Sequence, residues 1–465
     1  MKSILKNSVG KAERFARDEA KEVRGILGRI KRRDLKGNSG QAIKNSSYQL
    51  LRLLISKGGS IVFTILLARI LMPELFGLYS LTLSTILFLG IFADLGIANS
   101  LLNFISKSLA NKDYKKAKRY YEYALKIKMI LLLLTLVIIF STSYFISNTY
   151  YDKPIFMALL VGAFYIVFLS LSDHFTYVLM ANNTFRPLLI REILFQTLRL
   201  VFVPITAVFL IKMSFSPLEV LAYVFLILAL INLVNLISIY ITLKKDTPYL
   251  KEKTRSVSSK EKRAFKKFSF PLSVITLSGF ISGYIDILIL GHFVLGEFIG
   301  FYSIALNLAG SLWSILSFAS VAIYPIFTRL KGKVLESGFR KTRNITFVLS
   351  SLSAAFIFLL SDRLIFLIYG SDYSPAINLL RLFSLLVLLE PIIVLYTVYY
   401  MSKGKTWTLS RLLIITTILN IVLNYLFITH GLRTGMIHAV TGSAFAILIS
   451  RSVYLLMLGY LRQKD

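Results

Sequence analysis

Apolar stretches long enough to cross a lipid bilayer recur along the whole chain. A helical span needs about 20 mostly apolar residues, and hydrophobic residues make up 56% of the 465 positions. Strand barrels would show alternating segments of about ten residues instead, a pattern that we do not find. The sequence therefore predicts an all-α integral membrane protein. Twelve spans are expected, at 48–72, 77–105, 123–147, 154–181, 188–212, 218–243, 268–293, 299–328, 343–369, 376–402, 407–430 and 435–461.

Basic residues gather in alternate breaks between these spans. The formal net charge of +31 would suit a nucleic-acid partner in a soluble protein, but the positions of the charges argue against that reading. The basic segments are 2–44, 107–119, 244–267, 329–343 and 403–405, and the breaks between them carry little positive charge. This is the positive-inside pattern. It predicts a multi-pass protein of the cytoplasmic membrane with both termini in the cytoplasm, and no nucleic-acid partner.

Cysteine is absent, and only four histidines occur. A chain without thiols forms no disulfide and no thiolate metal site, and no histidine has a carboxylate or second histidine at zinc-motif spacing. We therefore expect neither a metal site nor a resident cofactor.

A short motif occurs twice, once after the first span and once after the seventh. Residues 67–81 align with 290–304 without a gap, and chance similarity between leucine-rich segments is the alternative explanation. The shared pattern E-x-x-G-x-Y-S pairs Glu74, Gly77, Tyr79 and Ser80 with Glu297, Gly300, Tyr302 and Ser303. With six spans per half, the copies face the same side, as in a parallel repeat about the membrane normal. The sequence thus predicts two pseudo-symmetric six-helix lobes.

This division predicts five segments along the chain. They are a basic cytoplasmic segment (1–47), a first lobe (48–243), a basic cytoplasmic linker (244–267), a second lobe (268–461) and a cytoplasmic tail (462–465). The first segment has apolar residues at helical spacing and would lie as an amphipathic helix on the anionic inner leaflet. A disordered basic arm is the alternative, because three glycines weaken the helix.

Ionisable residues inside spans are costly, and they mark functional sites when they face the protein interior. The deepest are Lys57, Asp94, Asp173, His174, Glu192, Arg199, Asp286 and Glu390, whereas Arg52 and Arg191 lie nearer the cytoplasmic ends. Each could instead snorkel or join helices. Glu192, Gln196 and Arg199 share one helix face and are expected to line a cavity. Lys57 lies beside two glycines, and we expect it and Asp286 to face the cleft between the lobes.

Asparagines mark further interior positions in the later spans. We expect most of them to hydrogen-bond between helices, and contact with sugar is the alternative that we keep for Asn307.

Several segments resemble a known family. The stretch ARILMPELFGLY (68–79), followed by FADLGI (92–97), resembles the amino-terminal signature of the polysaccharide transporters, the Wzx-like flippases of the multidrug/oligosaccharidyl-lipid/polysaccharide (MOP) exporter superfamily. YIDILILG (284–291), YGSDYSPA (369–376) and LNIVLN (419–424) resemble later landmarks. The start of the twelfth span departs from the family pattern, and the basic amino-terminal extension is longer than the family needs.

The resemblance implies a V-shaped pair of lobes, similar to multidrug exporters of the same superfamily. It implies a flippase, not an enzyme, that moves polyprenyl-(pyro)phosphate-linked oligosaccharide to the outer leaflet by alternating access for cell-surface polysaccharide synthesis. We expect Arg52, Lys57, Gln196, Arg199 and Asn307 to bind the headgroup. We expect Asp94, Asp173, His174, Glu192, Asp286 and Glu390 to act in gating or ion coupling, with a proton gradient, a sodium gradient and the membrane potential all left open as driving forces.

Expected partners are the lipid-linked oligosaccharide, membrane lipids and polysaccharide assembly enzymes. Two other functions remain open: a cation-coupled multidrug exporter of the same superfamily, and a membrane-embedded glycosyltransferase or polysaccharide polymerase. The multidrug exporter would favour an acidic cavity over one with a central lysine. The enzymes usually carry a large outer loop, and every outer loop predicted here is short.

Overall fold

A computed structural model describes residues 37–252, 257–330 and 332–463, and all regular structure in these residues is helical. Residues 1–36 of the predicted amphipathic segment lie outside them, and residues 37–47 form the start of the first described helix. The first lobe comprises α2 (Gly37–Gly90), η1 (Ile91–Ala93), α3 (Ile97–Ala110), α4 (Tyr114–Tyr144), the π-helical η2 (Phe145–Tyr151), α5 (Phe156–Ala181), α6 (Phe185–Lys212) and α7 (Pro217–Asp246). After η3 (Pro248–Lys251), the second lobe comprises α8 (Ser259–Phe293), α9 (Gly296–Ala322), α10 (Tyr324–Arg329), α11 (Gly332–Ile368), η4 (Ser371–Tyr373), α12 (Ala376–Ser402), α13 (Thr406–Leu432) and α14 (Met436–Gln463).

Eleven helices in the described residues are long and apolar enough to cross a membrane. The first of them, within α2, contains the first predicted span and the start of the second. Its helical path is broken at Met72, whose φ of 58° is left-handed, immediately before Pro73. A proline at this point removes a helical hydrogen bond and forces a kink. Counting the two parts of α2 separately gives twelve crossings, so the predicted all-helical membrane fold is confirmed.

The second predicted span, 77–105, is not continuous, and here the sequence-based boundaries are wrong. Helical structure stops at Gly90, passes through η1 and resumes at Ile97. Gly96 has a φ of 73°, a conformation that favours glycine. A Cβ on Gly96 would also lie 3.0 Å from the Cβ of Leu272, so α8 approaches the backbone closely here. Asp94 lies at this break, at the end of η1, with its side chain partly exposed.

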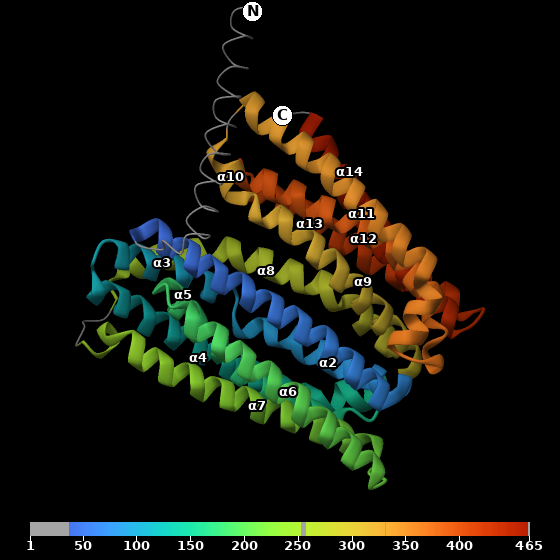
Figure 1. Ribbon diagram of the computed structural model, residues 1–465. Coiled ribbons are helices and arrows are strands. Elements are labelled where there is room, and N and C mark those ends of the chain that lie inside the picture. Colours follow the sequence, from blue (N-terminus) through green and yellow to red (C-terminus); the bar gives the residue numbers. More distant parts are fainter. Residues whose placement is uncertain (1–36, 253–256, 331, 464–465) are drawn as a thin grey trace, which may run out of the picture.

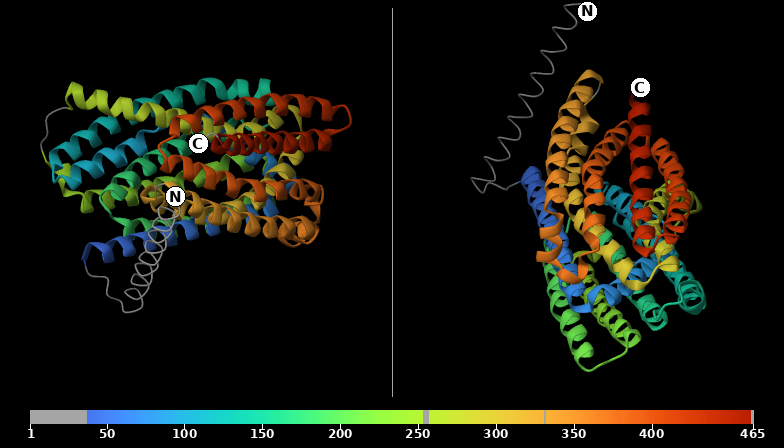
Figure 2. Two further views of the ribbon diagram at one scale, coloured as in Figure 1. Left: turned by 90° about the horizontal axis from the view of Figure 1, so that it is seen from above. Right: turned by 90° about the vertical axis from the view of Figure 1, so that its right-hand side faces the viewer.

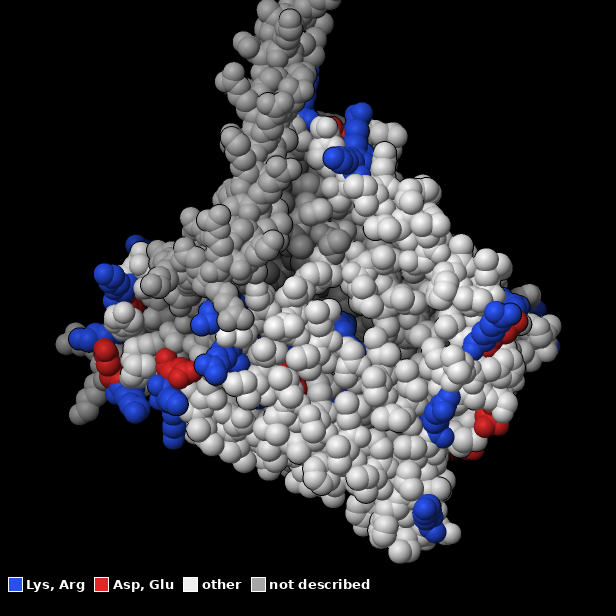
Figure 3. All heavy atoms as spheres, in the orientation of Figure 1, with Lys and Arg blue, Asp and Glu red and all other residues white. Residues whose placement is uncertain are grey.

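The two lobes meet at one end and diverge at the other. Figure 1 shows them approaching where α2 turns and α9 begins, and spreading apart towards the ends of α3 and α14. In Figure 2 (right), α11 and α14 lie on the side of the molecule opposite α6 and α7. We call the end with residues 107–119, 244–252 and 403–405 the basic end. In the space-filling view, charged side chains gather towards the helix ends and the middle of this face is mostly uncharged (Figure 3).

The two copies of the repeated motif contact one another at the opposite end. A Cβ on Gly77 would lie 1.7 Å from the carbonyl oxygen of Gly296 and 2.7 Å from the amide nitrogen of Gly300. Only glycine permits this separation between the two backbones. Gly77 and Gly300 are the corresponding glycines of the repeat, so equivalent positions of the two lobes meet, as expected near an axis that relates them.

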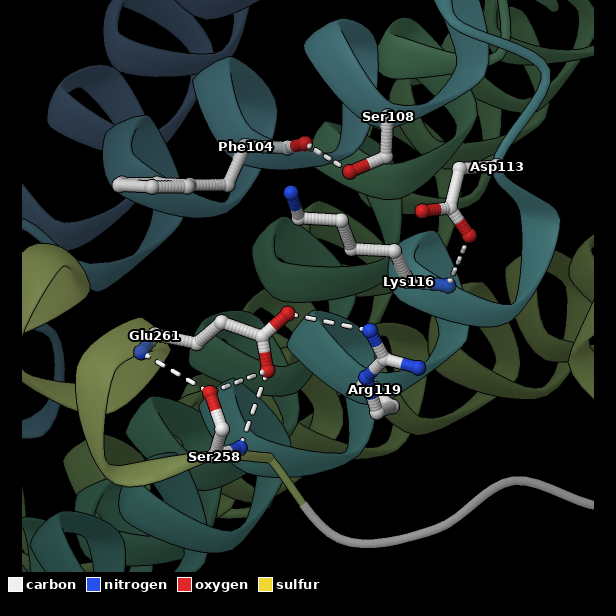
Figure 4. Close-up of polar contacts among 7 residues, drawn as sticks. All are labelled: Phe104, Ser108, Asp113, Lys116, Arg119, Ser258 and Glu261. Carbon is white, nitrogen blue, oxygen red and sulfur yellow. Dashed lines mark hydrogen bonds and ion pairs between the residues drawn. The ribbon is translucent and has the colours of Figure 1, made fainter.

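The start of α8 is anchored to the first lobe at the basic end. Arg119 of α4 pairs with Glu261 at 3.0 Å, and Glu261 also forms a capping box with Ser258, which fixes where the helix begins (Figure 4). Phe265 is fully buried and packs in the hydrophobic cluster that contains Ile105 and Tyr120. Residues 259–267 of the predicted linker are therefore helical and packed.

Candidate functional site

A cavity of about 300 Å³ lies between the lobes, where α2 faces α9. Lys57, Ser60 and Thr64 line it from α2, and Asn307 and Ser311 line it from α9. We call it the lysine cavity. Lys57 is its basic residue, and it is surrounded by hydroxyl and amide groups that can donate hydrogen bonds. The space-filling view shows a hollow between the lobes in which Lys or Arg atoms are visible (Figure 3). The expectation that Lys57 faces the cleft is met.

Close packing of α2 on α6 sets the direction in which Lys57 points. A Cβ on Gly59 would lie 2.6 Å from Oε1 of Gln196, so this glycine lets α6 approach, whereas nothing lies within 4 Å of the corresponding point on Gly58. Ser60 accepts a hydrogen bond from Arg199 at 3.1 Å. With this face of α2 held by α6, the exposed Lys57 is directed away from α6.

The polar face of α6 packs against α2 and does not line the lysine cavity. Arg52 pairs with Glu192 at 3.5 Å, Gln196 donates to Glu192 at 2.8 Å, and Arg199 donates to Gln196 at 2.8 Å. The guanidinium of Arg199 also lies 4.4 Å from the ring centre of Phe63. These four polar residues form one chain of contacts inside the first lobe. The stripe was expected to line a cavity, but it points at the neighbouring helix α2 and lines neither interlobe cavity.

A second interlobe cavity, of about 690 Å³, lies where the second span is broken. Asp94, Lys128 and Asp173 line it from the first lobe, and Phe280 and Tyr284 line it from α8. We call it the charged cavity. Nζ of Lys128 lies 3.0 Å from Oδ1 of Asp94, and the exposed fraction of these side chains is 1% for Lys128 and 29% for Asp94.

Asp173 and His174 diverge, as neighbours on a helix must. Asp173 is exposed to the charged cavity. His174 is fully buried on the other side of α5, 6.1 Å from the ring of Tyr121, and neither of its ring nitrogens has a hydrogen-bond partner. His174 therefore lines neither cavity.

Lys128 is a site residue that the sequence analysis missed. It lies five residues into the predicted third span, close to the basic break, where a lysine is expected to snorkel to the interface. The structure buries it instead. Arg191, which the sequence placed near a helix end, is also buried, with Nε and one terminal guanidinium nitrogen unpartnered.

Asp286 lies in the interior of the second lobe, so the prediction that it faces the cleft is wrong. Nδ2 of Asn424 donates to Asp286 at 2.6 Å, and Ser443 donates to Oδ1 of Asn424 at 2.6 Å. The physical reason is that Asp286 lies on the side of α8 that packs against α13, which supplies Asn424. Ser443 of α14 bonds to Asn424 in turn. Glu390 of α12 pairs with Arg451 of α14 at 3.0 Å. Asn307 lines the lysine cavity, whereas Asn424 is buried beside Asp286 inside the second lobe.

Side chains of one lobe bond to the backbone of the other at the end opposite the basic end. Arg69 donates to the carbonyls of Leu367 and Ile368 at the end of α11, and Tyr373 donates to the carbonyl of Ala68 at 2.8 Å. Lys153 donates to the carbonyl of Gly291 at 2.6 Å. Cations at helix carboxyl ends satisfy carbonyls that lack helical partners. Together with the glycine contact, these bonds close this end of the molecule.

The family model of "Polysaccharide biosynthesis protein" matches residues 42–331. The chain belongs to this family. No curated protein sequence matches it at a significant level.

Solved structures of the MOP superfamily share the fold. An inward-facing multidrug resistance MATE family transporter has a TM-score of 0.65 at 16% identity, covering 90% of this chain and 99% of that one. The lipid II flippase MurJ in an inward closed conformation has a TM-score of 0.66 at 16% identity, with 89% and 87% covered. A MOP superfamily transporter from Pyrococcus furiosus, described as having a binding pocket of reverse polarity, has a TM-score of 0.56 at 16% identity, with 92% and 96% covered. The predicted family and lobed fold are confirmed.

Proposed function

We propose that this protein is a flippase that carries polyprenyl-(pyro)phosphate-linked oligosaccharide across the cytoplasmic membrane by alternating access. The observation that carries the proposal is Lys57, which reaches into the lysine cavity between the lobes. A cation there suits a phosphate, and the surrounding Ser60, Thr64 and Asn307 suit phosphate oxygens or sugar hydroxyls. The lipid tail would remain in the bilayer while the headgroup passes between the lobes. The similarity to a lipid II flippase supports a lipid-linked cargo.

The shape corresponds to one state of such a cycle. The lobes are bonded together at one end by Arg69, Tyr373 and the Gly77 contact, and they diverge at the basic end. With the basic end in the cytoplasm, the substrate would enter from the inner leaflet, and export requires these bonds to break. We assign ion coupling or gating to Asp94, Asp173, Asp286 and Glu390. Arg52, Glu192, Gln196 and Arg199 would instead hold α2 in place.

The charged cavity favours a second candidate, a cation-coupled multidrug exporter. Asp94 and Asp173 lie there opposite the rings of Phe280 and Tyr284. Carboxylates and aromatic rings suit an organic cation. This exporter would protect cells against cationic drugs, which a flippase would not do, so a drug-susceptibility assay of a deletion strain separates the two candidates.

The decisive test replaces Lys57 in cells that lack the chromosomal copy. Losing a charge-assisted hydrogen bond costs about 1.5–3 kcal/mol, so Lys57→Ala should lower export at least about tenfold and trap lipid-linked oligosaccharide in the inner leaflet. Lys57→Arg should retain most export. The matched control is Lys212→Ala, an exposed lysine at the end of α6 that lines neither cavity. Export by Lys57→Ala at the wild-type rate would refute the phosphate role.

A further inference from the structure

A groove of about 840 Å³ lies on the second lobe between α11 and α14, with α12 as its floor. Its helices are on the side of the molecule away from α6 and α7 (Figures 1 and 2). Phe347, Leu456 and Tyr460 line the groove with 52%, 71% and 59% of their surface exposed. Apolar side chains this exposed, in helices of membrane-spanning length, face lipid. The groove therefore opens towards the bilayer.

The polarity of the groove changes along each of its helices. On α11, Arg340 and Arg343 come first and Phe347 follows one turn deeper in the membrane. On α14, which runs the other way, Leu456 comes first and Arg462 lies at the basic end. Both helices thus place cations at the basic end and apolar groups towards the middle of the bilayer. This is the polarity of an amphiphile whose anionic head lies at the membrane surface.

The polar end of the groove keeps an excess of positive charge. One carboxylate, Glu336, contacts both Arg340 and Arg462, and it also accepts a hydrogen bond from Tyr399 at 2.9 Å. Nε of Arg462 is buried without a partner. Arg343 donates only to its neighbour Asn344, at 3.2 Å, among the contacts of the described residues. The groove is thus lined by three guanidinium groups and one carboxylate, which contacts only two of them. Guanidinium groups are well suited to binding phosphate.

We propose that this arginine groove binds an anionic phospholipid of the leaflet at the basic end. Its phosphate would bind Arg340, Arg343 and Arg462, and an acyl chain would lie along Phe347 and Leu456. A phospholipid fits better than the transported lipid, because the groove is separate from both interlobe cavities and opens directly to the bilayer. Basic pockets between helices near the cytoplasmic surface favour anionic lipid headgroups.

Gly459 offers a test that leaves the arginines in place. It lies in the wall of the groove on α14, and nothing lies within 4 Å of the position that its Cβ would occupy. A Cβ there meets no protein atom, so a leucine side chain is expected to extend into the groove. Gly459→Leu should therefore exclude the lipid without disturbing the fold.

The experiment measures lipid binding to the purified full-length protein by native mass spectrometry. The probes are dioleoylphosphatidylglycerol, dioleoylphosphatidylcholine and undecaprenyl phosphate. Each basic residue near a membrane surface strengthens anionic-lipid binding about fivefold, so Arg340→Gln with Arg343→Gln should weaken phosphatidylglycerol binding about 25-fold. The charge-matched control is Lys333→Gln with Lys341→Gln, two exposed lysines of α11 outside the groove. The control should bind as the wild type does.

Gly459→Leu should lose phosphatidylglycerol and keep its thermal stability, so the proposal stays testable if the arginine variant fails to fold. Phosphatidylcholine should bind weakly to every variant. Two results would overturn the proposal. One is retention of phosphatidylglycerol by Gly459→Leu or by the folded arginine variant. The other is retention by the wild type of undecaprenyl phosphate in preference to phosphatidylglycerol.

Discussion

The ion pair of Lys128 and Asp94 should respond unequally to loss of its two partners. Lys128 has an exposed fraction of 1% and Asp94 one of 29%, because Asp94 borders the charged cavity. Removing one partner of a fully buried pair costs about 3–5 kcal/mol, since the other charge is left uncompensated. Asp94→Asn leaves the buried ammonium of Lys128 without its counter-charge. Asp173 lines the same cavity and offsets part of the loss, so we expect the lower end of that range, about 3 kcal/mol.

Lys128→Met should cost less, although it removes the same pair. Methionine has a similar length and fills the apolar space around the lysine chain, while the remaining carboxylate of Asp94 keeps its contact with the cavity. We expect a loss of about 1 kcal/mol, because a partly hydrated charge is penalised much less than a buried one. The double variant, Asp94→Asn with Lys128→Met, should be more stable than Asp94→Asn alone.

The assay is reversible unfolding of the purified protein in mixed micelles, followed by tryptophan fluorescence and analysed as a double-mutant cycle. Asp113→Asn is a useful control, because Asp113 is an exposed carboxylate of the same lobe that lies outside the cavity. The reasoning is refuted if Lys128→Met destabilises the protein as much as Asp94→Asn does. Equal losses would mean that the lysine and the carboxylate are buried to the same degree.

Two further predictions concern the closed end of the molecule. Gly77→Ala places a Cβ 1.7 Å from the carbonyl oxygen of Gly296, so it should separate the lobes at this end. In the proposed cycle that would favour the outward-open state. Gly58→Ala, where nothing lies within 4 Å of the Cβ position, should have no such effect. Because the chain has no cysteine, spin labels on engineered cysteine pairs can report the separation by pulsed electron spin resonance, and unchanged distances in Gly77→Ala would contradict the prediction. Arg69→Gln removes the bonds to the end of α11 and should shift the same distances in the same direction. The control variant Lys212→Gln should leave these distances unchanged.

Hydropathy, charge alternation and the internal repeat were sufficient to predict the lobes. Each depends on local composition, which the bilayer makes unusually informative because every span must be apolar and helical. The repeat also identified Gly77 and Gly300 as equivalent positions. It did not predict that they touch, because equivalence under an axis does not give the distance of either residue from that axis.

The candidate site was only partly predictable. Lys57 and Asn307 line one cavity, and Asp94 and Asp173 line the other, as a rule about charges inside spans suggests. The same rule wrongly predicted that Asp286 faces the cleft. Hydropathy shows that a polar face must meet protein or water, but it does not show which neighbouring helix that face meets. Lys128 was missed for a related reason. Lys128 is buried against Asp94, which lies where the neighbouring span is broken near Gly96. The sequence does not reveal this break, because the apolar run continues through it.

The contacts of α8 explain where a movement between the lobes has to be absorbed. Its first half is tied to the first lobe, since Ser269 donates to Ser100 at 2.8 Å and Ser273 donates to the carbonyl of Leu95 at 2.6 Å. Its second half belongs to the second lobe through Asp286. We therefore expect relative movement of the lobes to bend α8 between Ser273 and Asp286. Gly279 and Gly283 lie in this interval, with nothing within 4 Å of either Cβ position. Glycines favour helix bending, and both line the charged cavity, so a bend here would reshape the cavity that holds Asp94 and Asp173.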